Sequence, residues 1–466
     1  MGLIDKLRRL ERATRPLDPE LQRALDRRWR GLPESAKTPG QVLGRHAVGC
    51  EGTHGVFPKC NFTCTPCYHS ADANRVRVDG EHAQVEVAAQ MALFRQERGP
   101  YAHAQLIGGE VSLLPPEDHA AALATMRSAG REPMSMTHGD FDYEYLRRVA
   151  VGPRGKRRFA RLSFAAHFDM LMRGRRGLPR PSSEAELNPY RREFVEMFRR
   201  LRREHRVRYF LAHNMTVTPA NLGQVAQVIR DCHGMGYGMF SFQPAAFVGD
   251  ERRWREDYDQ VTSDAVWAEI EKGAGSKLDF GVVQHGDERC NRVAHGFYVG
   301  DRWYPALDGD DPADVAARDS FYKYLGGMAF GSIPPLLLAA RVARVAARHP
   351  GLVAGAGAWA IRRLREVGLV PLVRHGIRPV SFVMHTFMDA SEVIPAWEAM
   401  QKGEALADPQ LRATQERLAA CHYSMAHPET GSLVPACVQH SVLDPAENAQ
   451  LRVLLPIPTR RRDPVA

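Results

Sequence analysis

The chain has 466 residues, of which 44% are hydrophobic and 25% are charged, a balance that excludes wholesale disorder and collagen-like order. Its length exceeds what one compact core usually reaches, which excludes a small disulfide-stapled scaffold and predicts a large domain with an appended region, or several domains. The formal charge of +9 permits an anionic partner, but the sequence has no RNA-recognition or zinc-finger motif, so we expect no nucleic-acid partner.

The sequence predicts a cytoplasmic protein. No run reaches the roughly 18 to 20 uninterrupted apolar residues of a transmembrane helix. The best stretch, Tyr324–Ala340, is interrupted by glycine and proline pairs, and Asp5 and Lys6 interrupt what would have to be the apolar core of a signal peptide. Because disulfides are rare in a reducing compartment, the eight cysteines are expected to bind metal, act in catalysis or stay buried as thiols.

Residues 1–44 are predicted to form an N-terminal helical arm. Leucines alternate there with arginine and glutamate, which indicates two short amphipathic helices separated near Pro16 and Pro19. A solvated arm and a basic helix on a membrane surface both fit this pattern.

Residues 45–250 alternate short β-rich runs with helical stretches, which predicts an α/β domain. The right-handed crossover rule makes such strands parallel, and a partial (β/α)6 TIM-like barrel is the expected closure. The expected strands are 54–58, 104–107, 134–137, 161–166, 207–217 and 239–244, and the clearest helices between them are 84–98, 119–129, 188–204 and 220–235.

Polar and small residues gather where the expected strands end, which is where a barrel of this type has its chemistry. They are Cys60–Cys67, Gly108–Glu110, His138–Asp140, His167 with Asp169, His213–Asn214 and Gln243. Any one of these groups could be an ordinary polar loop, but all of them together are typical of an active-site rim.

Residues 251–466 lose this alternation and are predicted to form an α+β C-terminal extension that shapes the substrate site. A charged helix is expected near Asp264–Lys272, and a pair of arginine-bearing helices between Leu336 and Gly368. The pair either packs on the barrel with solvated arginines or makes peripheral contact with a membrane and admits an acyl chain. Its first helix has arginines on one face and aliphatic residues on the other: Arg341, Arg344 and Arg348 against Leu338, Val342 and Val345.

The most informative motif is Cys60-Asn-Phe-Thr-Cys64-Thr-Pro-Cys67, a C-x3-C-x2-C spacing directly after the first expected strand. Three thiolates leave a tetrahedral zinc one ligand short, and no second C-x2-C or H-x3-H pair supplies the fourth. Three thiolates on one loop instead suit three corners of an iron-sulfur cube, with one iron left without a protein ligand. A zinc or purely structural metal loop is the alternative.

These cysteines, with Gly108-Gly109-Glu110 one helix and one strand later, resemble the radical S-adenosylmethionine (radical SAM) superfamily. The resemblance implies a [4Fe-4S] cluster on the three cysteines, chelation of its open iron by SAM, and reductive cleavage of SAM to a 5′-deoxyadenosyl radical that abstracts hydrogen from a substrate. It also implies an electron donor such as ferredoxin or flavodoxin. Glycines permit close backbone approach, and the Glu110 carboxylate or nearby carbonyls can accept hydrogen bonds from the SAM ammonium.

Ser163, Asn214 and Gln243 resemble, by position, the SAM-contacting residues of that family, although each is also compatible with an ordinary hydrogen-bonded barrel residue. Many members have an aromatic residue just before the third cysteine. This chain has Pro66 there, and Tyr68 is the candidate to contact the adenine instead.

Three further cysteines, Cys290, Cys421 and Cys437, lie outside the expected barrel. They are either inert buried thiols or an auxiliary iron-sulfur or mononuclear metal site. The candidates to complete such a site are His285, His385 and His422.

The tail has a resemblance of its own. His385-Thr-Phe-Met-Asp389, Cys421-His-Tyr and Pro435-Ala-Cys437 resemble the C-terminal pattern of a radical SAM subgroup that includes archaeal tetraether lipid synthase. Ala436 departs from the larger residue that is common there.

The expected function is therefore that of a radical SAM enzyme acting on an unknown substrate, with a lipid chain as the first candidate. A radical SAM methylase or peptide-modifying enzyme is the second interpretation, and a non-catalytic metal-binding structural protein is the alternative of another class. A leader-peptide-binding domain or a dense C-terminal run of cysteines would favour peptide modification, and neither is visible.

Overall fold

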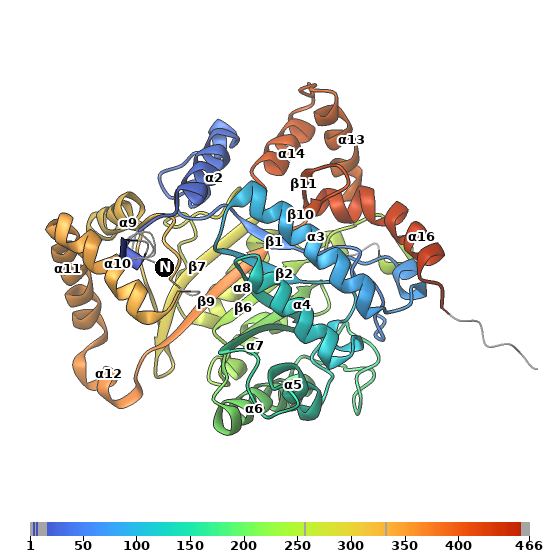
Figure 1. Ribbon diagram of the computed structural model, residues 1–466, viewed down its shortest axis with the longest axis horizontal. Helices are drawn as coiled ribbons and strands as arrows, with labels where there is room; N and C mark the ends of the chain where they lie inside the picture. The colour runs from blue at the N-terminus through green and yellow to red at the C-terminus, as the bar shows by residue number, and fades with distance from the viewer. Residues whose placement is uncertain (1–2, 5, 8–15, 256–257, 331–332, 458–466) are drawn as a thin grey trace, which may run out of the picture.

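The computed structural model describes residues 3–4, 6–7, 16–255, 258–330 and 333–457. Its centre is an 11-stranded sheet with the order β11-β10-β1-β2-β3-β4-β5-β6-β9-β7-β8. Strands β10, β1 to β6 and β9 run parallel to one another, whereas β11, β7 and β8 add antiparallel edges. The sheet curls, so the predicted α/β partial barrel is confirmed (Figure 1).

The strands are β1 Cys50–Gly52, β2 Ala102–Leu106, β3 Arg131–Thr137, β4 Arg161–His167, β5 Arg208–Val217, β6 Met239–Pro244, β7 Asn291–Val299, β8 Arg302–Pro305, β9 Arg378–His385, β10 Tyr423–His427 and β11 Ser432–Pro435. The first half of the chain contains the helices α2 Pro19–Arg30, α3 Gly80–Arg98, α4 Pro116–Ser128, α5 Tyr143–Ala150, α6 Asn188–His205 and α7 Val225–Cys232. The second half contains α8 Ser263–Ala274, α9 Pro312–Leu325, α10 Pro335–Arg348, α11 Pro350–Val367, α12 Leu369–His375, α13 Ala390–Gln401, α14 Pro409–Ala419, α15 Ala436–Val438 and α16 Asp444–Leu454.

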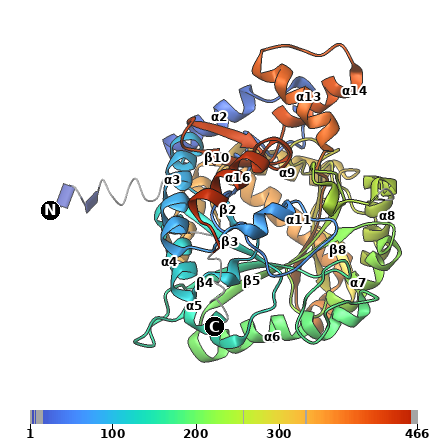
Figure 2. The same cartoon turned by 90° about the vertical axis from the view of Figure 1, so that its right-hand side faces the viewer.

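Helices α3 to α8 form an arc around the outer face of the sheet, as Figure 2 shows. Side chains alternate along each strand, so one set packs against these helices and the other points into the curl. In β2, Ala104 and Leu106 belong to the main hydrophobic core, whereas Gln105 between them lines the interior cavity. This alternation places polar side chains inside the curl without exposing the apolar core.

The first predicted strand is wrong in position, because β1 is Cys50–Gly52 rather than 54–58. Gly55 has a φ of 67°, which an extended strand cannot contain, and Pro58 lacks the N–H that a ladder needs. The next five strands and the helices between them lie where they were expected.

A buried ion pair joins the first strand to the third. Glu51 and Arg131 side chains are both 0% exposed, and the guanidinium donates to both carboxylate oxygens, at 3.0 Å from Nε and 2.9 Å from Nη2. Such a bidentate pair compensates the desolvation of two charges only while both partners are present.

The C-terminal half of the chain adds strands to both edges of the parallel sheet. Strand β9 pairs with β6, and β10 pairs with β1, so the sheet continues across the predicted boundary at residue 250. Of the predicted arm helices, the second corresponds to α2, and the first falls largely outside the described residues.

The predicted pair of arginine-bearing helices corresponds to α10 and α11. Val345 is buried, as its apolar face requires, but Arg341 is also only 8% exposed and lies 5.9 Å from the ring of Tyr101. The expectation that the arginines of this pair are solvated is therefore wrong for Arg341 and right for Arg348, which is exposed. Within the described residues, no helix is both long and apolar enough to cross a membrane.

Candidate functional site

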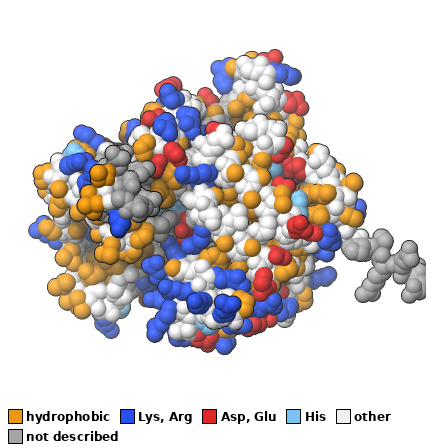
Figure 3. All heavy atoms as spheres, in the orientation of Figure 1, with side chains coloured by type: hydrophobic (Ala, Val, Ile, Leu, Met, Phe, Trp, Pro, Cys, Tyr) orange, Lys and Arg blue, Asp and Glu red, His pale blue; other side chains and the backbone are white. Residues whose placement is uncertain are grey.

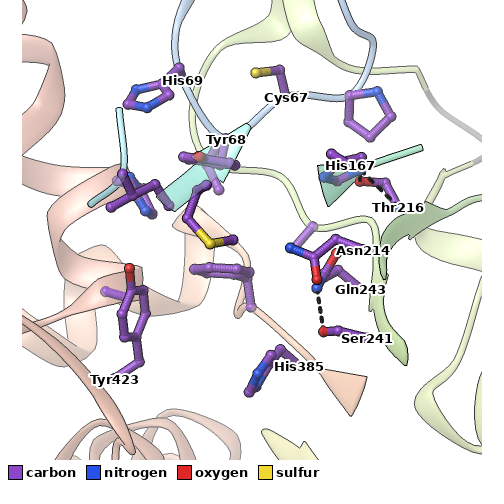
Figure 4. A pocket seen from close by; sticks show the side chains of 18 of the residues that line it. Cys67, Tyr68, His69, His167, Asn214, Thr216, Ser241, Gln243, His385 and Tyr423 are labelled. Atoms are coloured by element: carbon purple, nitrogen blue, oxygen red, sulfur yellow. Dashed lines mark hydrogen bonds between the residues drawn. The ribbon is translucent and has the colours of Figure 1, made fainter. Parts of the chain in front are cut away.

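A cavity of about 260 Å³ lies inside the curl of the sheet. Residues of successive parallel strands line it, because their inward-pointing side chains meet there. These include Gln105 of β2, Met136 of β3, Ala165 of β4, Asn214 of β5, Gln243 of β6 and His385 of β9. Figure 4 shows several of these side chains around the cavity.

The loop after β1 brings Cys60, Cys64 and Cys67 to one wall of this cavity. Side chains of neighbouring segments help to hold this loop in place. The backbone N–H of Cys60 donates to Asn74 Oδ1 at 2.8 Å, and Arg253 Nη1 donates to the Cys64 carbonyl at 2.8 Å. The three sulfur atoms therefore have a defined setting before any ligand is considered.

Burial raises the pKa of all three thiols, that of Cys60 to about 12. The positive charge of Arg253 acts against this shift at each of them. Thiols in such a setting ionise when a bound cation compensates their charge, which fits a metal-ligand set better than a set of free nucleophiles.

The number of the thiols also bears on what they can bind. The sulfurs of Cys60, Cys64 and Cys67 do not all lie within 4.8 Å of one another; among the described residues, the trio that meets this limit is His54, His427 and Glu447. Three protein thiolates leave a tetrahedral zinc one ligand short, whereas they match three of the four irons of a [4Fe-4S] cluster.

Gly108 and Gly109 are required by the packing of the cysteine loop. A Cβ at Gly109 would lie 2.2 Å from the Lys59 carbonyl oxygen, and one at Gly108 would lie 2.6 Å from the ring of Phe57. The N–H of Gly109 donates to the Phe57 carbonyl at 2.9 Å, which fastens the two loops together. Both glycines line the cavity, as the predicted close backbone approach requires.

Glu110 is fully buried, and its carboxylate faces the end of β3 instead of the cavity. Its Oε1 accepts hydrogen bonds from Ser112 N at 2.9 Å and Thr137 Oγ1 at 2.7 Å, and its Oε2 accepts one from His138 N at 2.7 Å. These hydrogen bonds occupy both carboxylate oxygens and connect the segment Gly108–Glu110 to the end of β3. The predicted contact of this side chain with SAM finds no support in this geometry, and the alternative of nearby carbonyls stays a prediction.

The three predicted contact residues of the later strands separate into two groups. Asn214 and Gln243 line the cavity (Figure 4). Ser163 does not line it, although Ala165, two residues later in β4, does. Gln243 Nε2 donates to Ser241 Oγ at 2.8 Å, and the side-chain amide of Asn214 bonds to no described residue. Asn214 is therefore the better placed of the two to bind a ligand.

Tyr68 and His69 cover the cavity beside the cysteine loop (Figure 4). His69 Nε2 donates to the Gly108 carbonyl at 2.6 Å, while the Tyr68 hydroxyl lies 3.4 Å from the same oxygen. Burial lowers the pKa of His69 to about 4, so the ring is neutral at physiological pH. The Tyr68 side chain thus lies where the sequence predicts an aromatic partner for a ligand.

Cys290, Cys421 and Cys437 line the same cavity. Arg417 Nε donates to Cys290 Sγ at 3.2 Å, and Met388 N lies 3.4 Å from Cys437 Sγ. Burial raises the pKa of Cys437, and the neighbouring thiols Cys421 and Cys290 raise it further, which indicates that the three groups share one electrostatic environment.

The histidines proposed to complete this second set differ in position. His385 and His422 line the cavity, and His385 Nδ1 contacts Asn291 Oδ1. His285 does not line it, and its Nε2 lies 3.2 Å from that of His295. The His422 ring is neutral, since burial lowers its pKa to about 3.

Sequence reasoning missed three residues of this site. Cys50 lines the cavity at 3.3 Å from His422 Nε2, and Arg253 and Tyr258 hold the carbonyls of the cysteine loop. Cys50 was visible only as an isolated cysteine ten residues before the motif, and the other two belong to a segment with no motif at all. Cys232, by contrast, is fully buried in the hydrophobic core outside the curl.

No family model matches the sequence, and no curated protein does. Among solved structures, the chain is similar to Streptococcus suis SuiB bound to S-adenosylmethionine, with 12% identity, a TM-score of 0.28, and coverage of 42% of this chain and 40% of that one. It is also similar to native anSMEcpe with bound AdoMet, with 14% identity, a TM-score of 0.32, and coverage of 47% and 57%. The chain thus spans only part of either relative, and likenesses this distant identify neither a family nor an activity.

Proposed function

We propose that the chain is a radical SAM enzyme. The supporting observation is the convergence of Cys60, Cys64 and Cys67 with the backbone of Gly109 and the side-chain amide of Asn214 on one cavity inside the curl of the sheet. Three thiols of raised pKa on one loop, one ligand short of a tetrahedral zinc site, are a donor set that fits a [4Fe-4S] cluster. When bound, such a cluster supplies the electron that cleaves SAM and so starts hydrogen abstraction.

The residues of the chain have separate tasks in this proposal. The cysteines hold the cluster, and the glycines let the backbone approach SAM closely. Asn214 and Gln243 offer amide groups to polar parts of SAM from β5 and β6. The enclosing sheet and the side chains of Tyr68 and His69 limit the access of water to a reactive radical.

Anaerobic reconstitution with iron and sulfide tests this function. The wild-type chain should take up a [4Fe-4S] cluster and, when reduced, convert SAM to 5′-deoxyadenosine. Cys64→Ala should lose SAM cleavage and the iron of this cluster, keeping only iron that the second site described below binds. Cys232→Ala, a thiol in the core outside the curl, should keep both the cleavage and the full iron content. Cluster uptake without SAM cleavage would favour the alternative of a structural metal protein, and cleavage by the Cys64→Ala variant would refute the assignment.

We also infer an auxiliary metal site on Cys290, Cys421 and Cys437, with Cys50 as a fourth thiol. Burial raises the pKa of Cys50 to about 11, and the charge of Cys421 contributes to the shift, so the two thiols are electrostatic neighbours. N–H groups directed at the sulfurs of Cys290 and Cys437 are the donors that a bound thiolate would require.

Iron content separates the two sites. A variant with Cys60, Cys64 and Cys67 all replaced by alanine should still bind iron and sulfide after reconstitution, and the further change Cys437→Ala should remove them. If the triple variant binds no iron, the auxiliary site is refuted while the first site stands.

We propose an unactivated hydrocarbon chain as the substrate class. The cavity is rich in methionine, whose flexible side chain adapts to apolar ligands of varied shape. The methionines that line it are Met134, Met136, Met172, Met239 and Met388. Phe387 and Phe62 add aromatic surface, and no acidic side chain other than Asp169 lines the cavity among the described residues.

Deuterium transfer distinguishes this substrate from the alternatives. Perdeuterated lipid extract should place deuterium in the 5′-deoxyadenosine that the enzyme releases, whereas deuterated peptides should not. Label that arrives from peptide instead of lipid would favour a peptide-modifying enzyme, and methylated product would favour a methylase.

A further inference from the structure

Helices α10, α11 and α12 form a separate layer against the β7–β8 edge of the sheet (Figure 1). Val367 packs with Val299 and Tyr304 in a small hydrophobic cluster, and Trp359 Nε1 donates to the Ala306 carbonyl at 2.8 Å. One side of the layer is thus packed against the protein, so its opposite side faces away from the sheet.

The outer side of this layer is apolar. Figure 3 shows hydrophobic side chains gathered over these helices, with basic side chains at their border. A contiguous apolar surface of this kind marks an interaction site, whereas aliphatic side chains that are exposed singly are ordinary. The exposed residues are Leu336 (86%), Val353 (55%), Ile361 (51%), Leu369 (64%), Val370 (77%), Val373 (78%) and Ile377 (55%).

The helical spacing makes this surface continuous. In α11, Val353, Gly357, Ile361 and Leu364 recur at helical intervals on one face, and a Cβ at Gly357 would meet no atom within 4 Å. The stripe is therefore an amphipathic face that points away from the protein and has no covering element within the described residues.

The same layer concentrates the positive charge of the chain. Residues 333–378 contain eight arginines and a single acidic residue, Glu366. Arg362 and Arg363 pair with Asp314 on the protein side, and Glu366 pairs with Arg363. The remaining exposed arginines flank the apolar stripe and form no ion pair within the described part of the chain: Arg348, Arg365 and Arg374.

We propose that the outer face of α10 to α12 docks on an anionic phospholipid bilayer. Aliphatic side chains can enter the boundary between headgroups and acyl chains while the flanking arginines contact lipid phosphates, the arrangement of an interfacial amphipathic helix. Charge complementarity selects an anionic bilayer, because three arginines of the face have no acidic partner among the described residues and its acidic residue, Glu366, is already paired. This inference is independent of the cluster and of the substrate.

Vesicle flotation of the full chain tests the proposal. The protein should float with phosphatidylcholine vesicles that contain phosphatidylglycerol, should float poorly with phosphatidylcholine alone, and should be released as salt is raised. Replacing Arg348, Arg365 and Arg374 by serine should weaken binding about fivefold for each arginine, or on the order of 100-fold together. Val370→Asp with Val373→Asp should abolish it.

Matched variants control for loss of charge and of apolar surface elsewhere. Serine at Arg154, Arg180 and Arg202 removes three exposed arginines outside this layer. Val85→Asp with Val453→Asp changes two aliphatic residues that are 61% and 83% exposed. Both sets should float like the wild type.

Two outcomes would overturn the proposal. One is the absence of flotation with anionic vesicles. The other is equal loss of flotation in the test and control variants. If the wild type instead forms a dimer or a protein complex that Val370→Asp disrupts, without vesicle binding, the face is a protein interface. All of these substitutions are at exposed positions, so thermal unfolding should confirm that each variant is folded.

Discussion

Arg253 is predicted to control how firmly the cysteine loop holds its cluster. The side chain is 8% exposed, and its Nη1 donates to the Cys64 carbonyl at 2.8 Å. Its charge also lowers the pKa of each loop thiol against the upward shift caused by burial. Arg253→Gln removes the charge and retains a shorter hydrogen-bonding side chain.

The size of the effect follows from that single contact. A hydrogen bond from a charged donor contributes about 1.5–3 kcal/mol, which corresponds to roughly 10-fold to 100-fold in an equilibrium constant. Loss of an outer partner of a metal ligand typically lowers metal affinity by about the same factor. We therefore expect the Arg253→Gln variant to retain its cluster about 10-fold to 100-fold less tightly.

Chelator competition after anaerobic reconstitution measures this change as iron and sulfide retained per chain. Arg252→Gln is the matched control, because Arg252 is the neighbouring arginine, 53% exposed, and pairs with Asp72 and Asp250 instead of the cysteine loop. Equal retention in the wild type and the Arg253→Gln variant would refute the reasoning. Equal loss in both variants would show that the segment as a whole, not the bond to Cys64, supports the loop.

Three further predictions concern the frame of the site. Gly109→Ala should lower the iron content after reconstitution, since its Cβ would lie 2.2 Å from a carbonyl oxygen of the cysteine loop. Gly223→Ala, whose Cβ would meet nothing within 4 Å, should leave the iron content unchanged, and equal iron content in the two variants would contradict the packing argument. Arg131→Met should lower the free energy of unfolding in urea by about 3–5 kcal/mol by leaving Glu51 buried without a partner, and adding Glu51→Leu should restore most of it. Burial lowers the pKa of His54, but its bond to a carboxylate of α16 outweighs burial and raises the pKa above its ordinary value of about 6.5. The charged ring therefore stabilises the fold fully below that value and less as pH rises through the raised pKa, so the Tm advantage over a His54→Gln variant should shrink at high pH; a constant advantage would argue against it.

The parallel core could be predicted from the sequence because its signals are local. Strands β2 to β6 are apolar runs of suitable length, and the helices between them are long enough for right-handed crossovers. The position predicted for the first strand is wrong because residues 54–58 look β-like in composition, whereas Gly55 has a positive φ that an extended strand does not allow. Local pattern thus predicted a strand before the cysteine loop but not its bounds, and β1 ends two residues before the predicted strand begins.

Residue type alone could not assign the task of Glu110. A carboxylate after two glycines is equally suited to bind a ligand or to cap a turn, and its choice depends on the neighbouring strand. Here Thr137 and the backbone of His138, at the end of β3, supply donors that occupy both carboxylate oxygens. The glycines behave as expected because their requirement is steric and lies within the motif itself.

The second cysteine set shows which part of a site lies beyond sequence reasoning. Cys290, Cys421 and Cys437 reach the cavity only because β9 and β10 extend the parallel sheet at its two opposite edges. Strand β9 pairs with β6, and β10 pairs with β1. That pairing spans long stretches of chain with no periodic signal, and it also brings Cys50, at the start of β1, opposite Tyr423 of β10. A cysteine ten residues before the motif thereby becomes a neighbour of one near the C-terminus. The pairing of β1 with β10 thus brings the fourth thiol, that of Cys50, to the proposed auxiliary site. The iron content of the variants tests this site, because no further pattern in the sequence can.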